Sequence, residues 1–184
     1  MKSLFISLLT FFAFNSQATL LELKVDQASY QEGDTVTATI VAKNFPYTLG
    51  GFAGEVSFDD NALALTSWQF GQGFDDGFGS FSYADDSVSG SLYLEDYAYI
   101  FADEPTIIAN QGSEFVLASI QFSAIGTGQQ SLSLLNGVEV LSFDNTMLEQ
   151  LQGMSVTFDV TSVPTPASIA LFSLALLLLR RVKR

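Results

Sequence analysis

Alternation of apolar and polar residues dominates the middle of the chain. Residues 154–161 (MSVTFDVT) are apolar at every even position and polar at every odd one. Residues 114–124 repeat the pattern, with Val116, Ala118, Ile120 and Phe122 on one side and Ser119, Gln121 and Ser123 on the other. A period of two is typical of a β-strand with one buried face and one solvated face. Residues 35–42 (TVTATIVA) are rich in the β-branched residues that favour strands. Further strands are predicted at 20–25, 51–58, 62–68, 89–94, 129–134 and 138–143.

Clusters of Gly, Asn and Asp separate these segments, at residues 31–34, 59–61, 126–128, 136–137 and 144–145. About nine short strands divided in this way predict an all-β fold, an antiparallel jelly-roll β-sandwich. No helical run is long enough to cross between parallel strands, and only residues 145–151 (NTMLEQL) suggest a helical turn.

The N-terminal end has the features of a secretory signal peptide. Lys2 precedes an uncharged apolar run at residues 4–14, and small residues follow at Ser16 and Ala18. We therefore predict a signal peptide over residues 1–18 that is cleaved after Ala18.

The C-terminal segment, residues 163–184, combines a Pro-x-Pro motif, an apolar run at 167–179 and a basic end. Thirteen helical residues span only about 20 Å, which is short for a membrane core of about 30 Å. The basic end is expected to stay in the cytoplasm, which places the acidic body outside the inner membrane. The two motifs consist of Val163, Pro164, Thr165 and Pro166, and of Arg180, Arg181, Lys183 and Arg184.

This order of features resembles the PEP-CTERM sorting signal of Gram-negative bacteria, which an exosortase recognises and cuts. Thr165 stands where the commonest form of that signal has Glu. The resemblance implies a membrane-anchored precursor whose mature product ends near Pro166 and reaches the cell surface or the medium. An ordinary C-terminal tail anchor is the alternative. The chain then divides into a signal peptide (1–18), one domain (19–162) and a sorting segment (163–184).

Charge and composition exclude several functions. The body holds all 20 acidic residues and only two bases, Lys24 and Lys43, a net charge of −18. Nucleic-acid binding needs clustered bases that displace counterions, so this charge excludes it. The chain has no His and no Cys, which excludes Ser-His-Asp and Cys-His catalysis, zinc fingers and disulfides.

Several segments, in their order along the chain, resemble a cohesin domain, the module that captures dockerin modules in cellulosomes. They are residues 30–37 (YQEGDTVT), 49–63 (LGGFAGEVSFDDNAL), 115–122, 126–128 (GTG) and 138–140 (VEV). The resemblance covers about residues 21–160 and implies a nine-stranded jelly roll. It also implies an exported binding or scaffolding module of the cell surface or extracellular matrix, with a dockerin-like protein or a polysaccharide as partner.

A candidate binding surface is formed by aromatic residues at Tyr93, Tyr97, Tyr99 and Trp68. In residues 93–101 (YLEDYAYIF) the tyrosines share one parity, as expected for a strand with a half-exposed Tyr face or for a platform that binds protein or glycan. A carbohydrate-binding module or a small glycan-active protein of polysaccharide metabolism is therefore the alternative function. The Gly-rich stretch 71–86 is either a loop over one end of the sandwich or part of a contact surface.

Acidic pairs raise two further hypotheses. Pairs at 59–61, 75–76, 85–86, 95–96, 103–104 and 144–145 offer oxygen ligands for calcium, although none has the spacing of an EF-hand loop. Most such pairs are solvated turn residues, so calcium is a candidate and no metal ligand is assigned. Paired carboxylates also catalyse glycoside hydrolysis, but a small sandwich leaves little room for a deep cleft, and we predict a protein that is not an enzyme.

Overall fold

The computed structural model describes residues 20–163. The predicted signal peptide with Ala18, and the predicted sorting segment from Pro164 to Arg184, lie outside the described residues. Within the described part, no helix is both long and apolar enough to span a membrane.

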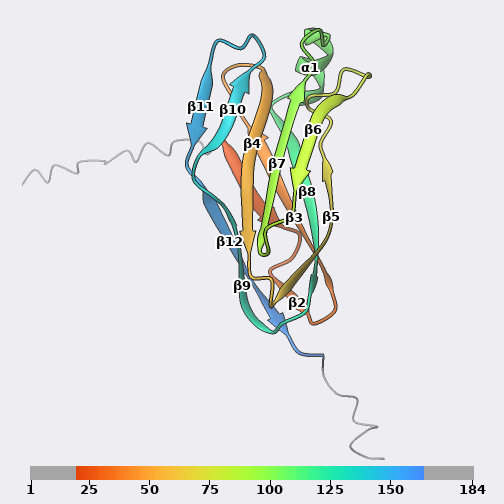
Figure 1. Cartoon of the computed structure of the whole chain (residues 1–184), viewed down its shortest axis with the longest axis vertical. Helices are drawn as coiled ribbons and strands as arrows, with labels where there is room; N and C mark the ends of the chain where they lie inside the picture. The colour runs from red at the N-terminus through yellow and green to blue at the C-terminus, as the bar shows by residue number, and fades with distance from the viewer. Residues whose placement is uncertain (1–19, 164–184) are drawn as a thin grey trace, which may run out of the picture.

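Two β-sheets pack face to face (Figure 1). The smaller sheet has the strand order β1-β3-β8-β5, and all its pairings are antiparallel. Its strands are β1 (Leu21–Val25), β3 (Thr35–Lys43), β8 (Glu114–Ala124) and β5 (Leu63–Phe70).

The larger sheet is centred on β4 (Leu49–Phe58). One edge of β4 pairs with β7, which pairs in turn with β6, and the other edge pairs with β10 and then β9. The short β2 pairs in parallel with β12, whereas the other described pairings are antiparallel. The remaining strands are β2 (Ser29–Gln31), β6 (Ser80–Asp85), β7 (Ser91–Ala98), β9 (Gly128–Leu134), β10 (Val138–Ser142), β11 (Leu148–Leu151) and β12 (Met154–Thr161).

Two long strands of this sheet are each interrupted once. β9 and β10 follow one another along the same edge of β4, and β11 and β12 pair with them in the same order. Residues 135–137 and 152–153 form the interruptions, and Gly137 there has a φ of +89°. Because of these interruptions, β10 and β9 pair one after the other with the same edge of β4, as strand segments do on the two sides of a β-bulge.

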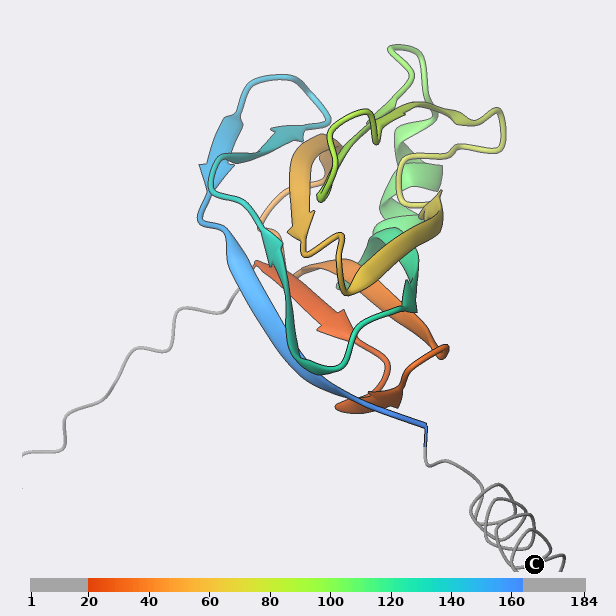
Figure 2. The same ribbon diagram turned by 60° about the horizontal axis from the view of Figure 1, so that its bottom comes forward.

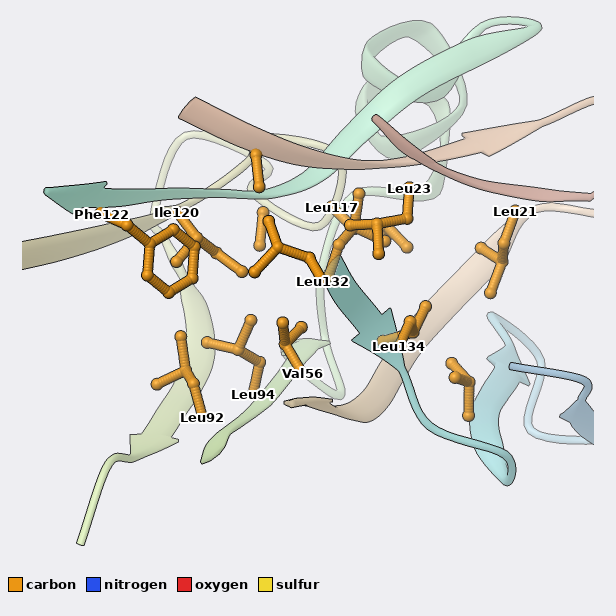
Figure 3. Close-up of a cluster of buried hydrophobic side chains, with 14 of the residues drawn as sticks. Leu21, Leu23, Val56, Leu92, Leu94, Leu117, Ile120, Phe122, Leu132 and Leu134 are labelled. Carbon is orange, nitrogen blue, oxygen red and sulfur yellow. The ribbon is translucent and has the colours of Figure 1, made fainter. Parts of the chain in front are cut away.

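The core lies between the sheets and is built from the apolar face of each strand. Figure 3 shows Leu92, Leu94 and Val56 of the larger sheet facing Ile120 and Phe122 of the smaller one. These five side chains are fully buried. The period-two pattern therefore does place its apolar residues inside the sandwich.

The predicted all-β sandwich is confirmed, and each of the nine predicted strands has a counterpart in the structure. Three short strands, β2, β6 and β11, were not predicted. The helical turn expected at 145–151 is wrong, because Leu148–Leu151 forms β11 against β10. The Gly-rich stretch 71–86 is irregular only in its first part, since Ser80–Asp85 pairs with β7 as β6.

One helix, α1 (Glu104–Gln111), was also missed. The Asp103 side chain caps its N-terminus by accepting a hydrogen bond from the Thr106 N–H, and Gly112 ends it with a φ of +51°. Only Ile107 and Gln111 of the helix are buried. A helix with so small a buried face leaves no hydrophobic period in the sequence.

Candidate functional site

The tyrosines of β7 lie on the outer face of the larger sheet. Tyr93 and Tyr97 are partly exposed, whereas Leu92, Leu94 and Asp96 between and beside them are buried. Side chains alternate between the two faces of a strand, so Tyr93, Glu95 and Tyr97 point away from the core.

The register of the sheet extends this face across neighbouring strands. Its first row runs from Phe81 through Tyr97 and Gly51 to Leu141 and Leu148. The second row is Tyr83, Glu95, Ala53, Glu139 and Gln150, and the third is Asp85, Tyr93 and Glu55. We call these three rows, on β6, β7, β4, β10 and β11, the outer tyrosine face. It combines an apolar row with two rows that carry aromatic and acidic side chains.

Aromatic and acidic groups contact one another on this face. The Tyr93 hydroxyl donates a 2.8 Å hydrogen bond to Glu95, and the rings of Tyr83 and Tyr93 have centroids 6.4 Å apart. Burial raises the pKa of Tyr93 to about 12, with a further contribution from Glu95. Burial also raises the pKa of Tyr97, as do the charges of Glu95 and Glu139. Both hydroxyls therefore stay protonated in the physiological range and remain hydrogen-bond donors.

The carboxylates of this face have no basic neighbour in the sheet. Among the described residues the bases are Lys24 on β1 and Lys43 on β3, and both strands belong to the smaller sheet. Lys43 pairs there with Glu22 and Glu114. The outer tyrosine face therefore presents uncompensated negative charge.

Gly51 fixes the position of the Tyr97 ring. A Cβ atom at position 51 would lie 2.0 Å from Tyr97 Cδ1, so the ring occupies the space that any other residue would need. At this end of the face, Tyr97 and Tyr99 line a hollow of about 230 Å³ together with Leu141 and Phe143. Ile100 beside it is 84% exposed. Apart from Asn145, the side chains that line the hollow are apolar or aromatic.

The outer face of the smaller sheet is different in kind. Its central rows pair Thr37 with Gln121 and Ser67, and Thr39 with Ser119 and Gln69. These side chains are neutral and polar, as expected of a face that is simply solvated. The exposed aromatic residues that lie on strands, Phe81 and Tyr83, therefore both belong to the larger sheet.

Trp68 does not join the tyrosines. It lies on β5 in the smaller sheet, opposite Ile120, and is partly buried against the core. A register shift between Leu65 and Ser67 adds one residue to β5, which turns both Leu65 and Trp68 inward. The structure thus brings together Tyr93, Tyr97 and Tyr99 of the predicted surface and separates Trp68 from them.

Sequence reasoning missed the residues that β6, β10 and β11 contribute to this face. Phe81 and Tyr83 are 56% and 49% exposed, and they alternate with Ser82 and Ala84. That alternation was the available signal, but the preceding glycines concealed it. Leu141 and Glu139 could be placed only from the register of β10 with β4.

Most acidic pairs have a role in turns. Asp59, Asp75, Asp76, Asp85 and Asp144 each accept a hydrogen bond from the backbone N–H two residues further on. Hydrogen bonds from the following turn residues lower the pKa of Asp59 and Asp85 below the ordinary value. In the described part of the chain, no three acidic side chains come together in a group that could hold a metal ion.

Comparisons with known proteins give a match in structure alone. No family model matches the sequence, and no curated protein matches it either. The cohesin module of a family 33 glycoside hydrolase from Clostridium perfringens has 12% identity and a TM-score of 0.61, over 78% of this chain and 96% of that one. A type II cohesin from the cellulosome of Acetivibrio cellulolyticus has 18% identity and a TM-score of 0.60, over 76% and 90%.

A third similar structure is a type II Cohesin-X-Dockerin complex from Acetivibrio cellulolyticus, with 11% identity and a TM-score of 0.57, over 77% of this chain and 94% of that one. At these identities the likeness concerns the fold. The two sheets described above are therefore arranged as in a cohesin module.

Proposed function

We propose that this protein is a binding module that captures another protein on its outer tyrosine face. The observation that carries the proposal is the difference between the two sheets. One outer face has rows of Thr, Ser and Gln, whereas the other has exposed aromatic and leucine side chains beside carboxylates without a basic neighbour. Aromatic residues are enriched at protein interfaces, because they supply large contact area at low entropy cost.

The chemistry of the face indicates the chemistry of the partner. Glu55, Glu95 and Glu139 would attract a surface with Lys or Arg, and the hollow beside Tyr97 and Tyr99 would take an apolar side chain. A dockerin-like module is the partner class that we propose, since a cohesin of similar fold has been solved in complex with an X-dockerin. We propose binding without catalysis.

The terminal segments supply the proposed location. A signal peptide at 1–18 and a PEP-CTERM-type segment at 163–184 would send the domain through the inner membrane to an exosortase-type enzyme, in a Gram-negative bacterium. The domain would then act at the cell surface or in the extracellular matrix. Mass spectrometry of the mature surface protein tests this part, and an intact Arg184 would exclude processing by an exosortase.

Binding is tested with the immobilised full-length chain and a panel of purified dockerin modules and extracellular polysaccharides. The decisive variants are Tyr97→Ala and the charge reversal Glu139→Lys. Loss of a buried aromatic contact of about 2 kcal/mol would weaken binding roughly 30-fold. Glu32→Lys makes the same charge change in the exposed turn before β3 and serves as the control.

The expected result is capture of a dockerin module that both face variants weaken and the control leaves unchanged. Retention by polysaccharide alone would refute the protein-binding proposal and support the carbohydrate-binding alternative. Equal retention by all variants would place the contact elsewhere on the molecule.

A further inference from the structure

Asp96 is a buried carboxylate without a partner. It faces inward on β7, its side chain is 0% exposed, and neither of its oxygens has a hydrogen-bond partner. Its neighbours across the sheet are Phe52 on β4 and Ser82 on β6. Burial raises the pKa of Asp96 to about 6 and the charge of Asp75 adds to the rise, while the nearby Ser80 hydroxyl and the Tyr97 N–H oppose it. An ionised carboxylate in such a place is unfavourable unless a cation or strong hydrogen bonds compensate for the lost water.

The loop before β6 brings a second carboxylate to this place. Phe74 is buried and stacks on Phe52, with ring centroids 6.2 Å apart, so the loop lies over the strand that flanks Asp96. Asp75 follows Phe74 directly, and its Oδ1 accepts 2.7 Å hydrogen bonds from the N–H groups of Gly77 and Gly79. Both bonds go to one oxygen, which leaves the other available.

One neutral oxygen, the Ser80 hydroxyl, lies beside Asp96. Ser80 follows Gly79 directly and pairs with Ala98 of β7. Ala98 is two residues after Asp96 on β7, so Ser80 lies on the same inward face of the sheet as Asp96. Figures 1 and 2 show α1 and the loop before β6 at the same end of the sandwich. Gln111 of α1 donates a hydrogen bond to the Gly73 carbonyl and ties the loop down. The loop is thus fixed beside Phe52, the cross-strand neighbour of Asp96, and it brings the Ser80 hydroxyl to the same face.

No basic side chain in the described part of the chain neutralises Asp96. Lys43 pairs with two glutamates of the smaller sheet, and Lys24 lies on β1 of that sheet. We propose that Asp96 and Asp75 hold a calcium ion beneath the loop, with the Ser80 hydroxyl, loop carbonyls and water as further ligands. Calcium suits this set because it takes six to eight oxygen ligands in irregular geometry. A site with two carboxylates is expected to bind in roughly the 10⁻⁴–10⁻³ M range of extracellular calcium modules.

This site is separate from the outer tyrosine face. Asp96 faces the core, whereas Glu95 and Tyr97 on either side of it face outward. The inference therefore does not rest on the proposed function. Failure to bind calcium would leave the protein-binding proposal untouched, and failure to bind a dockerin module would leave the calcium site untouched.

The test measures calcium binding by the full-length chain after treatment with EDTA. Isothermal titration calorimetry with calcium chloride is expected to show one site. Calcium at 5 mM is expected to raise Tm by about 5 °C, whereas magnesium at the same concentration controls for general screening of the acidic surface. Asp96→Asn and Asp75→Asn are each expected to weaken calcium binding at least tenfold. Asp86→Asn removes the same charge from an exposed turn and should change nothing.

Each outcome decides the proposal. One calcium site in the wild type that both asparagine variants lose supports it. No binding by the wild type, equal stabilisation by magnesium, or unchanged binding by Asp96→Asn would overturn it. Circular dichroism in EDTA checks that the variants fold, and Asp96→Asn should then be at least as stable as the wild type, because it no longer buries a carboxylate.

Discussion

Gln111 joins three parts of the molecule, and its removal tests how strongly the contacts between them stabilise the domain. Its amide accepts a 2.9 Å hydrogen bond from the Leu49 N–H and donates 2.7 Å and 3.0 Å bonds to the carbonyls of Leu49 and Gly73. Gln111 is 5% exposed and Leu49 is 0% exposed. The side chain thus connects α1 with the start of β4 and with the loop over Asp96.

Gln111→Ala would leave the two buried backbone groups of Leu49 without partners. Each unpaired group costs about 1–3 kcal/mol, so we expect a loss of about 4 kcal/mol in the free energy of unfolding. That is a large part of the 5–15 kcal/mol typical of a domain, and it corresponds to roughly 10 °C in Tm. Helix propensity cannot account for this loss, because Ala is a better helix former than Gln.

Urea denaturation followed by fluorescence measures this loss, since Trp68 is the only tryptophan and packs partly buried against the core. Gln121→Ala is the matched control. Gln121 is exposed on the smaller sheet and accepts one hydrogen bond, from the Ser67 hydroxyl, so its loss should cost less than about 1 kcal/mol. A Gln111→Ala protein within 1 kcal/mol of the wild type would refute the reasoning, because the Leu49 groups would then have found other partners.

Three further changes test other contacts. Gly51→Ala should displace the Tyr97 ring and weaken partner binding while the domain stays folded; unchanged binding in a calorimetric titration would show that the ring position is unimportant. Tyr30→Phe removes two hydrogen bonds of the buried Tyr30 hydroxyl, the 2.7 Å bond that it donates to Asp26 and the 3.0 Å bond that it accepts from the Gln27 N–H, and should cost about 1–3 kcal/mol in urea denaturation; a larger loss would indicate repacking around the ring. Lys43→Met breaks two exposed ion pairs and should lower Tm slightly at low salt and not at high salt; a loss that persists in high salt would point to packing instead.

The fold was predictable where one face of a strand is buried and the other is exposed to solvent. β3, β8 and β12 have that pattern, and most residues of their apolar sides are buried. Val116 of β8 is an exception: at the register shift between Ile40 and Val41 it is exposed and Leu117 is buried instead. β11 lacks it, because it pairs only with β10 at the edge of the sheet and its Leu148 is 62% exposed. An edge strand that contributes little to the core leaves little hydrophobic signal in the sequence.

The site was predictable only within one strand. The parity of residues 93–97 correctly separated the tyrosines from the leucines of β7. Trp68 was grouped with them by its chemistry, yet the extra residue in β5 turns its ring inward. A bulge changes the face of every later residue in its strand, and no pattern in residues 62–68 announces it. The neighbours contributed by β6 and β10 depend on register, which is a property of the folded sheet.

The alternation of β7 also explains why one strand can serve two separate purposes. Glu95 and Tyr97 face outward with the other residues of the outer tyrosine face, while Asp96 between them faces the loop that covers the core. A shift of one residue in the pairing of β7 would expose Asp96 and bury Tyr97. The Phe52 and Phe74 stack beside Asp96 and the Tyr97 ring over Gly51 both oppose such a shift. A variant of one face should therefore leave the other working, so Tyr97→Ala is expected to lose the partner and keep calcium, and Asp96→Asn to do the reverse.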